Sequence, residues 1–351
     1  MLAIKVPRIN AESVRKYLKK HAMLDAKHIP ITRNNFIYFP ISPENPGSSM
    51  PKALAALRAE FSEKQFSVSG SKPSYRDMLR EELGKDYDNV ARGYEVLGNI
   101  AIIDAEAATA KKVAGVVMNI NSNVRTVLRK SGAVHGVYRT REYAYVAGEK
   151  NYVSEYRENG AVLKFDVRKA FFSGKLSYER GRVAQLSKGA ENVVVMFAGV
   201  GPFAIEIARH NRKSNVVAIE LNKNAYKDMI GNIKLNKTEN VKAVCGNVKK
   251  LAKKYKGFAD RIVMPLPKDS HSFLGSVIDC AKSKCTVHYY TFVDNDRGTE
   301  KCISGLKDFF NEGGWSFKVL SIRTVRPYAH DTIEIVVDFR IAKRQNNEQV
   351  I

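Results

Sequence analysis

Two glycines and a carboxylate stand at the spacing typical of a site for an adenosyl ligand. The apolar, β-branched run at 193–197 predicts a buried parallel strand, and Gly199 and Gly201 after it let the backbone turn tightly beside a ligand. Pro202 suits the first turn of a helix. The next apolar run ends at Glu220, about 20 residues further on, where a carboxylate commonly binds ribose hydroxyls. Because the third glycine of G-x-G-x-x-G is missing, we expect an adenosyl ligand without a pyrophosphate, with S-adenosylmethionine as the leading candidate.

Neighbouring strand ends supply further candidate contacts to this cofactor. Asn247 follows the third predicted strand, where its amide would hydrogen-bond the adenine edge; its alternative role is the N-cap of the next helix. For Gly199 and Gly201 the alternative is a tight strand-to-helix turn without a ligand. The predicted cofactor site is completed by residues next to these turns, namely Phe197, Val200, Phe203, Leu221, Asn222 and Met264.

A second group of residues is suited to a flat acceptor molecule. Pro265 and Pro267 end the fourth predicted strand, and two prolines stiffen this loop into a partly apolar shelf on which a planar base would stack. A segment before the first strand carries Tyr178, Glu179 and Arg182. Its functional interpretation is an acid held near cations and facing the base, with Tyr178 stacking on it. The alternatives are an exposed ion-pair surface and a core tyrosine.

The charge balance indicates a polyanionic partner. The chain has 351 residues, 58 Lys and Arg against 36 Asp and Glu, a net charge of +22 and a pI near 9.7. Such an excess attracts polyanions through counterion release. Since no long basic tail explains it, the charge is spread over folded surface, which favours a large RNA over an anionic membrane surface or solubility alone. The basic segment 137–142, which includes Arg139, would touch RNA or line the site.

Several protein classes are not expected. No apolar run approaches the length of about 18 residues that a membrane span needs, and charges interrupt any signal sequence near the N-terminus. Cys245, Cys280, Cys285 and Cys302 show no C-x-x-C pairing, which is typical of reduced thiols in a cytoplasmic protein. The seven histidines show no metal-ligand spacing, so we expect no metal.

Strands and helices alternate through the domain predicted at 171–345. This alternation implies a mainly parallel, doubly wound sheet. The last two strands are joined by a short turn at 326–331 and must pair antiparallel. The expected strands are 193–197, 215–220, 241–245, 260–264, 285–292, 316–325 and 332–340. The predicted fold class is therefore α/β, with the Rossmann-like seven-stranded, mostly parallel sheet with one antiparallel strand that class I methyltransferases use.

Two smaller domains are expected before this one. A small basic N-terminal domain is predicted at 1–72 and an α+β domain at 75–170. The segment 67–74 between them is rich in Ser, Gly and Pro, as linkers are.

The chain resembles the archaeal and eukaryotic tRNA (guanine-37) N1-methyltransferases, the Trm5-type family. The resemblance runs from about residue 75 to 342, and residues 1–72 resemble the family's small N-terminal domain more loosely. Many ordered matches make it specific. They include Tyr156-Arg157-Glu158-Asn159-Gly160, residues 197–203, residues 264–267 and Val325-Arg326-Pro327-Tyr328.

The resemblance implies a function. A methyl group would pass from S-adenosylmethionine to position 37 of tRNA, beside the anticodon, forming N1-methylguanosine. Glu179 matches the family acid that takes the N1 proton, and Arg139 matches the arginine that steadies guanine O6 as negative charge develops. The chemistry agrees, because N1 accepts a methyl only as its proton leaves and the base must first leave its stack. The family likeness also implies that the N-terminal domain contacts the tRNA elbow. We expect a monomer that needs no protein partner and no membrane.

Three departures from the family pattern keep alternatives open. Val195 stands where the family usually has an acid and Asn247 where it frequently has an aspartate, changes that would reduce the grip on the cofactor. Pro265 replaces the asparagine of Asn-Leu-Pro and would accommodate a larger, flatter base. The close alternative is the archaeal paralogue that also methylates C7 of the tricyclic 4-demethylwyosine at the same position. Further alternatives are transfer of the 3-amino-3-carboxypropyl group from the same cofactor, and a tRNA-binding protein with a decayed cofactor site.

Overall fold

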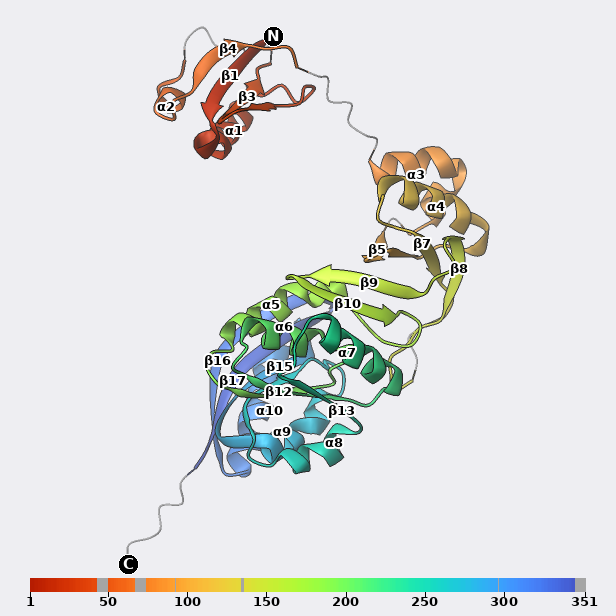
Figure 1. Ribbon diagram of the computed structural model, residues 1–351, viewed down its shortest axis with the longest axis vertical. Helices are drawn as coiled ribbons and strands as arrows, with labels where there is room; N and C mark the ends of the chain where they lie inside the picture. The colour runs from red at the N-terminus through yellow and green to blue at the C-terminus, as the bar shows by residue number, and fades with distance from the viewer. Residues whose placement is uncertain (43–49, 67–73, 92, 134–135, 296, 345–351) are drawn as a thin grey trace, which may run out of the picture. The chain divides into compact units, whose positions relative to one another are not determined.

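The computed structural model describes residues 1–42, 50–66, 74–91, 93–133, 136–295 and 297–344 (Figure 1). The chain divides into two compact units, Met1–Met78 and Leu79–Ile351. Almost all of the predicted linker at 67–74 lies outside the described residues. No helix in the described part of the chain is long and apolar enough to cross a membrane.

The first unit is a four-stranded antiparallel sheet in the order β2-β3-β1-β4. Helix α1 buries Ala11, Val14 and Leu18, a helical spacing, in one core with Ile4 and Val6 of β1. The elements are β1 (Leu2–Pro7), η1 (Arg8–Asn10), α1 (Ala11–Lys20), β2 (Ile31–Arg33), β3 (Phe36–Pro40), α2 (Lys52–Ala55) and β4 (Glu60–Glu63).

The second unit opens with a small mixed sheet in the order β5-β6-β7-β8. Its β6 and β7 pair in parallel, and α4 makes the crossover between them. The elements are α3 (Tyr75–Leu83), which crosses the boundary between the units, η2 (Gly84–Asn89), β5 (Tyr94–Leu97), β6 (Ile100–Ile103), α4 (Ala107–Ile120), β7 (Thr126–Lys130) and β8 (Tyr143–Gly148).

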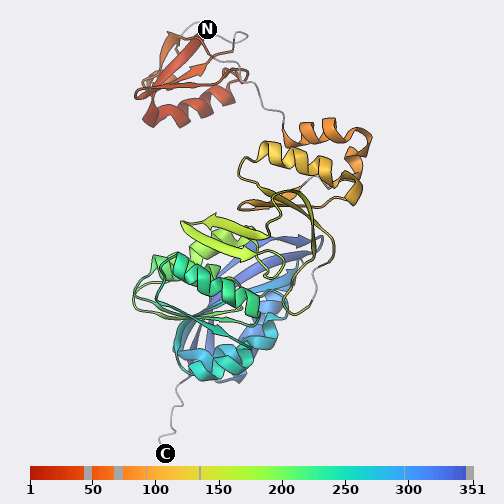
Figure 2. The ribbon, with the colours of Figure 1, turned by 45° about the vertical axis from the view of Figure 1, so that its right-hand side comes forward.

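A two-stranded ribbon, β9 (Val153–Glu158) and β10 (Ala161–Asp166), follows and packs on helix α7 (Lys223–Leu235). Asn232 of α7 and Asn236, which follows the helix as its C-cap, accept the backbone N–H groups of Lys164 and Val162 at 2.7 and 2.9 Å. Figures 1 and 2 show this yellow-green ribbon beside the large sheet. These bonds use the free backbone edge of β10 and fix the ribbon against α7.

The seven-stranded sheet has the order β13-β12-β11-β14-β15-β17-β16, and β17 alone among these seven strands runs antiparallel to its neighbours. This confirms the predicted fold class. The elements are η3 (Gly174–Leu176), α5 (Ser177–Leu186), β11 (Asn192–Met196), α6 (Pro202–His210), β12 (Asn215–Glu220), α7, β13 (Val241–Cys245), α8 (Val248–Leu251), η4 (Ala252–Tyr255), β14 (Ala259–Met264), η5 (Ser270–Phe273), α9 (Leu274–Cys280), β15 (Ala281–Asp294), α10 (Gly298–Glu312), β16 (Trp315–Ala329) and β17 (Thr332–Lys343).

The last hairpin is longer than the sequence predicts. Strand β16 continues through Pro327 to Ala329, so the turn to β17 is shorter than the expected segment 326–331. Irregularities in the pairing around Arg326 and Pro327 allow this, because bulges let a strand pass a proline without losing its partner.

Both faces of this sheet are covered. Val194 and Met196 of β11 pack in one apolar core with α8, α9 and α10, while Val193 and Val195 pack in a second core with α5 and α6. Alternate residues of a strand point to opposite faces, so a continuous apolar run is what this central strand requires. Strand β11 lies between β12 and β14, where the strand order reverses and ligands of such sheets bind.

Candidate active site

A cavity of about 250 Å³ opens at the carboxyl ends of β11, β12, β13 and β14, and we call it the strand-end cavity. Parallel strands bring these ends to one edge of the sheet although they are distant in sequence. The structure gathers there the following predicted site residues: Arg139, Phe197, Gly199, Glu220, Leu221, Asn222, Asn247, Pro265 and Pro267.

The glycine turn borders this cavity in a conformation that few side chains tolerate. The φ angles of Phe197, Gly199 and Gly201 are 54°, 57° and 91°, all in the left-handed region. A Cβ atom on Gly199 would have the carbonyl oxygen of Phe171 at 3.8 Å as its nearest contact, so the space in front of Gly199 is open. A Cβ atom on Gly201 would lie 2.8 Å from Cγ of Met229. Gly199 therefore borders the cavity, whereas Gly201 lets α6 pack closely on α7.

Glu220 is tied to this turn by its carboxylate. One oxygen accepts the backbone N–H of Gly199 at 2.7 Å, and the other accepts that of Asn222, also at 2.7 Å. Burial raises the pKa of Glu220, while these backbone donors oppose the shift. The result is an oriented carboxylate at the edge of a cavity, with lone pairs left for donors such as vicinal hydroxyls.

Asn222 and Asn247 both line the cavity and both cap helices. Asn222 accepts the N–H of Asn224 at the start of α7 and donates to the carbonyl of Lys169 at 2.7 Å. Asn247 accepts the N–H of Lys249 at 2.8 Å at the start of α8. The N-cap role that the sequence left open for Asn247 is thus present, and a contact to adenine stays a prediction.

Apolar and aromatic groups form much of the remaining wall. Pro265 and Pro267 lie near Phe273, whose ring meets that of Phe197 edge-on at 4.7 Å between centroids. Arg139 enters from the loop between β7 and β8, with its guanidinium carbon 5.1 Å from the centre of the Phe171 ring. The cavity therefore combines a flat apolar surface with a cation held over an aromatic ring.

Other predicted site residues do not line the strand-end cavity. Val200, Phe203 and Met264 are at most 2% exposed and belong to the hydrophobic cores. Tyr178 is 67% exposed, and its ring stacks with the guanidinium of Arg323 at 5.3 Å. Their proposed contacts to cofactor or base stay predictions.

Glu179 and Arg182 do not line the strand-end cavity and belong to a buried polar network. Arg182 donates to the Glu179 carboxylate at 2.8 and 3.0 Å and to Asp338 at 2.5 Å. Tyr290 donates its hydroxyl to Glu179 at 3.1 Å, and Arg323 lies 3.5 Å away. Glu179 is 3% exposed, so its side chain is held by protein partners at the start of α5.

The same network extends through the sheet. His288 contacts Asp338 through Nδ1 and Arg261 through Nε2, both at 2.6 Å, and Arg261 pairs with Glu191 at 2.8 Å. Burial lowers the pKa of His288, which favours the neutral ring that donates to Asp338 and accepts from Arg261. Burial alone would raise the pKa of Asp338, but its bonds to His288 and Arg182 hold it below the usual value. Each buried charge thus has a partner, as stability requires.

A buried ion pair in the cavity was not singled out from the sequence. Glu334 is 1% exposed, lines the strand-end cavity, and accepts from Nε of Arg326 at 2.5 Å. The available signal was a carboxylate inside the apolar alternation of β17, with Ile333 and Ile335 on either side. Phe171 and Phe273 also line the cavity without having been proposed as site residues, since an isolated aromatic carries no local signal.

Comparisons with known proteins agree with this architecture. The TRM5/TYW2 methyltransferase domain matches residues 154–319, the TYW2 N-terminal domain residues 75–151, and the tRNA methyltransferase 5 N-terminal domain residues 3–49. The tRNA (guanine(37)-N(1))-methyltransferase Trm5b of Pyrococcus abyssi is 34% identical over 347 residues, which cover 97% of this chain and 99% of that protein. The chain belongs to the TRM5/TYW2 methyltransferase family.

Two relatives that match a smaller share of this chain are named for reactions on 4-demethylwyosine at position 37 of tRNA. The tRNA 4-demethylwyosine(37)-methyltransferase Taw21 of Saccharolobus solfataricus is 30% identical and covers 73% of this chain and 96% of its own length. The tRNA(Phe) (4-demethylwyosine(37)-C(7)) aminocarboxypropyltransferase of Pyrococcus horikoshii is also 30% identical, covering 79% and 99%.

Solved structures of the family have the same fold. The crystal structure of wild-type Trm5b from Pyrococcus abyssi has a TM-score of 0.72 and 32% identity, covering 97% of this chain and 99% of that one. A complex of aTrm5 and tRNALeu has a TM-score of 0.67 and 26% identity, covering 97% of this chain and 99% of that one. Pyrococcus horikoshii TYW2 in complex with MeSAdo has a TM-score of 0.65 and 27% identity, covering 77% of this chain and 100% of that one.

The packing of Gly201 leads to a stability prediction. Gly201→Ala is expected to lower the free energy of unfolding by about 1–3 kcal/mol, because alanine is strained at this φ and its methyl group meets Met229. Gly231→Ala in α7 is the matched control, since a Cβ there meets nothing within 4 Å, and it should stabilise by up to about 1 kcal/mol. Chemical denaturation followed by the fluorescence of Trp315, the chain's one tryptophan, measures both. Equal effects of the two variants would contradict the packing role.

Proposed function

We propose that this protein transfers a methyl group from S-adenosylmethionine to N1 of guanine at position 37 of tRNA. The observation that carries the proposal is similarity over essentially the whole chain to a named N1-methyltransferase, including a match of the Trm5 N-terminal domain to residues 3–49. The relatives that act on 4-demethylwyosine are matched over nearly their full length, yet they cover only 73% and 79% of this chain.

The strand-end cavity fits an adenosyl cofactor. Gly199 leaves open space at the turn, and the half-buried Glu220 carboxylate is oriented by two backbone donors. Glu220 would accept the ribose hydroxyls, the turn at Gly199 would face the methionine part, and Asn247 would contact the adenine. When bound, S-adenosylmethionine supplies an electrophilic methyl group on a sulfonium.

The residues on the other side of the cavity would handle the guanine. Pro265 and Pro267 offer an apolar surface for its ring, with Tyr178 and Arg182 proposed nearby. Arg139, held over Phe171, would donate to O6 and stabilise the negative charge that develops as the N1 proton leaves. We assign the role of proton acceptor to Glu179, whose carboxylate is fixed by Arg182 and Tyr290.

The partner in this reaction is tRNA. The net charge of +22 supplies the attraction to a polyanion, and a family member has been solved with tRNALeu. We propose that the anticodon loop meets the strand-end cavity, that the basic N-terminal unit contacts the elbow, and that the enzyme acts as a cytoplasmic monomer. Among the described residues no cluster of metal-binding side chains is found, and the proposed chemistry uses none.

Product analysis tests the function directly. Incubation with S-adenosylmethionine and an unmodified tRNA that carries G37 is expected to give N1-methylguanosine, measured by nucleoside mass spectrometry. An aminocarboxypropyl increment in place of a methyl group would assign the chain to the other transfer reaction. If the tRNA stays unchanged and calorimetry detects no binding of S-adenosylmethionine, the cofactor site has decayed.

The second candidate function is methylation of C7 of 4-demethylwyosine at the same position. Pro265 on the cavity wall favours it, because a flat apolar surface accommodates a tricyclic base, and so does the similarity to Taw21. The same assay with tRNA that bears 4-demethylwyosine decides whether this activity accompanies the first.

The role of Glu179 leads to a kinetic prediction. Glu179→Gln is expected to slow single-turnover methylation by about 100-fold or more, with tRNA affinity roughly intact, because the amide cannot accept the N1 proton. Glu158→Gln is the matched comparison, since it neutralises another buried carboxylate that is paired with an arginine, Arg180, and lines neither cavity. If Glu179→Gln slows the reaction no more than Glu158→Gln does, Glu179 is not the base.

The raised pKa of Glu220 predicts a pH dependence of cofactor binding. The ionised carboxylate accepts both ribose hydroxyls, so affinity should fall as the pH drops through a pKa above the usual value of about 4.3. Glu220→Gln should weaken binding about 10- to 100-fold at neutral pH and remove this decline. Calorimetric titration with S-adenosylmethionine across the acid range measures both effects. Parallel pH curves for the two proteins would exclude Glu220 as the titrating group.

A further inference from the structure

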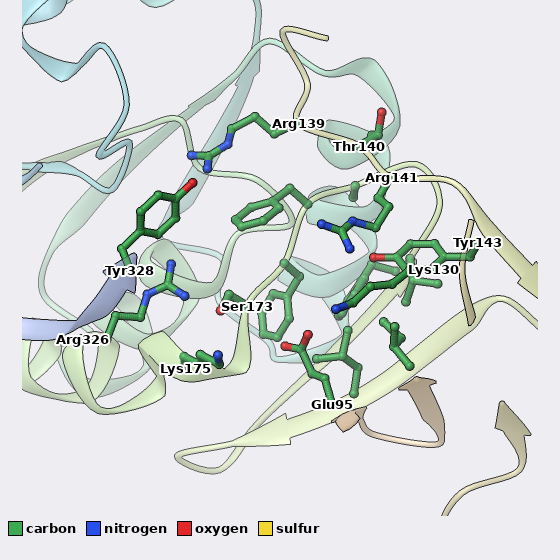
Figure 3. A pocket seen from close by; sticks show the side chains of 17 residues that line it. Glu95, Lys130, Arg139, Thr140, Arg141, Tyr143, Ser173, Lys175, Arg326 and Tyr328 are labelled. Atoms are coloured by element: carbon green, nitrogen blue, oxygen red, sulfur yellow. The ribbon is translucent and has the colours of Figure 1, made fainter. Parts of the chain in front are cut away.

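A second cavity, of about 260 Å³, lies beside the strand-end cavity, and we call it the basic cavity (Figure 3). Arg139, Phe171 and Arg326 line both cavities and form the wall between them. Anything that fills both cavities at once must therefore pass over these three side chains.

The basic cavity is lined by five cations and one carboxylate, Glu95. The cations are Lys130, Arg139, Arg141, Lys175 and Arg326. Figure 3 shows the side chains of Arg141 and Arg326 entering from opposite sides. The excess of positive charge in a recess favours an anionic occupant.

Two of these five cations are paired with carboxylates, and a third, Arg139, lies over the Phe171 ring. Lys130 pairs with Asp104 at 2.8 Å, and Arg326 pairs with Glu334 at 2.5 Å. Within the part of the chain that the structure describes, no carboxylate lies at ion-pair distance from Arg141 or Lys175. These two side chains are thus available to a phosphate, for which arginine offers a bidentate donor pair.

Two exposed aromatic rings line the basic cavity. Tyr328 is 53% exposed and is supported from behind by Phe292, with ring centroids 4.0 Å apart. Phe171, on the dividing wall, is 44% exposed. Large exposed rings with fixed positions are the usual platforms on which unpaired bases stack.

The arginines, Lys175 and the exposed rings of this lining come from three segments that the fold brings together. The loop after β7 supplies Arg139 and Arg141, the connection from β10 to α5 supplies Phe171 and Lys175, and β16 supplies Arg326 and Tyr328. The basic cavity has room for one base, cationic side chains that can donate to a phosphate, and rings on which a base can stack. Because it adjoins the strand-end cavity, the two cavities together match two consecutive nucleotides of one strand.

We propose that the basic cavity binds the nucleotide next to the methylated base in the same RNA strand. Arg141 and Lys175 contact its phosphate, and its base stacks on Tyr328. The strand crosses the wall at Arg139 and Phe171, so that the target base enters the strand-end cavity. This inference rests on the proposed function. Capture of the neighbouring nucleotide offsets part of the cost of removing the target base from its stack.

The test compares Arg141→Ala/Lys175→Ala with a matched control, Lys301→Ala/Lys307→Ala, which removes two exposed lysines of α10. We expect the first double variant to bind tRNA about tenfold more weakly or worse and to lower the salt slope of binding by about two, one for each lost phosphate contact. The control should bind as the wild type does. S-adenosylmethionine affinity should be unchanged in both, and Arg141→Lys/Lys175→Arg should restore tRNA binding, which excludes misfolding as the cause.

The outcomes separate this inference from the proposed function. If the wild type methylates G37 and the Arg141/Lys175 variant behaves like the control, the basic cavity is not a nucleotide site and the function stands. If the wild type makes no methylated product but binds tRNA through Arg141 and Lys175, the cavity binds RNA and the function is wrong.

Cross-linking locates the bound nucleotide. A photoreactive 4-thiouridine is placed at each position flanking the target in turn, and cross-linked peptides are identified by mass spectrometry. One of the two positions should cross-link to the segment around Tyr328 or Lys175. Cross-links from both positions exclusively to other parts of the chain would overturn the proposal.

Discussion

The hydrogen bond from the Gly199 backbone to the Glu220 carboxylate is the interaction on which the strand-end cavity depends. At 2.7 Å it joins the end of β11 to the end of β12 and sets the direction of the carboxylate. Desolvation of Glu220 is unfavourable, and the two backbone donors offset part of that cost. The left-handed turn therefore has two roles. It reverses the direction of the chain after β11, and it points the Gly199 N–H at the Glu220 carboxylate.

Charge is divided between the two neighbouring cavities. The strand-end cavity is lined by two carboxylates, Glu220 and Glu334, and by two arginines, Arg139 and Arg326, whereas the basic cavity is lined by five cations and one carboxylate. Arg326 belongs to both and is anchored by Glu334. The shared wall thus separates a recess with balanced charges from one with an excess of positive charge.

A buried polar network ties helix α5 to the large sheet. It links Glu179 through Arg182 and Asp338 to His288 within the sheet, so α5 is held to strands β15 and β17 by charge-assisted bonds. Removing one member would leave a buried partner uncompensated, which is more costly than loss of an exposed pair. The network positions Glu179 by bonds that do not depend on a ligand.

The sequence by itself determined the sheet and the glycine–acid pair. Continuous β-branched runs separated by helical segments specify buried parallel strands, and parallel strands must bring their carboxyl ends, with Gly199, Glu220, Asn247 and Pro265, to one edge. These are local signals combined with a topological rule, so no tertiary detail was needed.

Only the tertiary structure decided which side chains face the cavities. Val200 and Met264 lie next to cavity residues in sequence, and Phe203 lies in the first turn of α6. All three side chains turn into the hydrophobic cores, because packing rather than proximity in sequence sets side-chain direction. Arg326 and Glu334 reach the strand-end cavity through the register of β16 and β17, which pairing irregularities shift. Contacts between segments that are far apart in the chain leave no local sequence pattern. The basic cavity, which such segments form, therefore could not be predicted from the sequence.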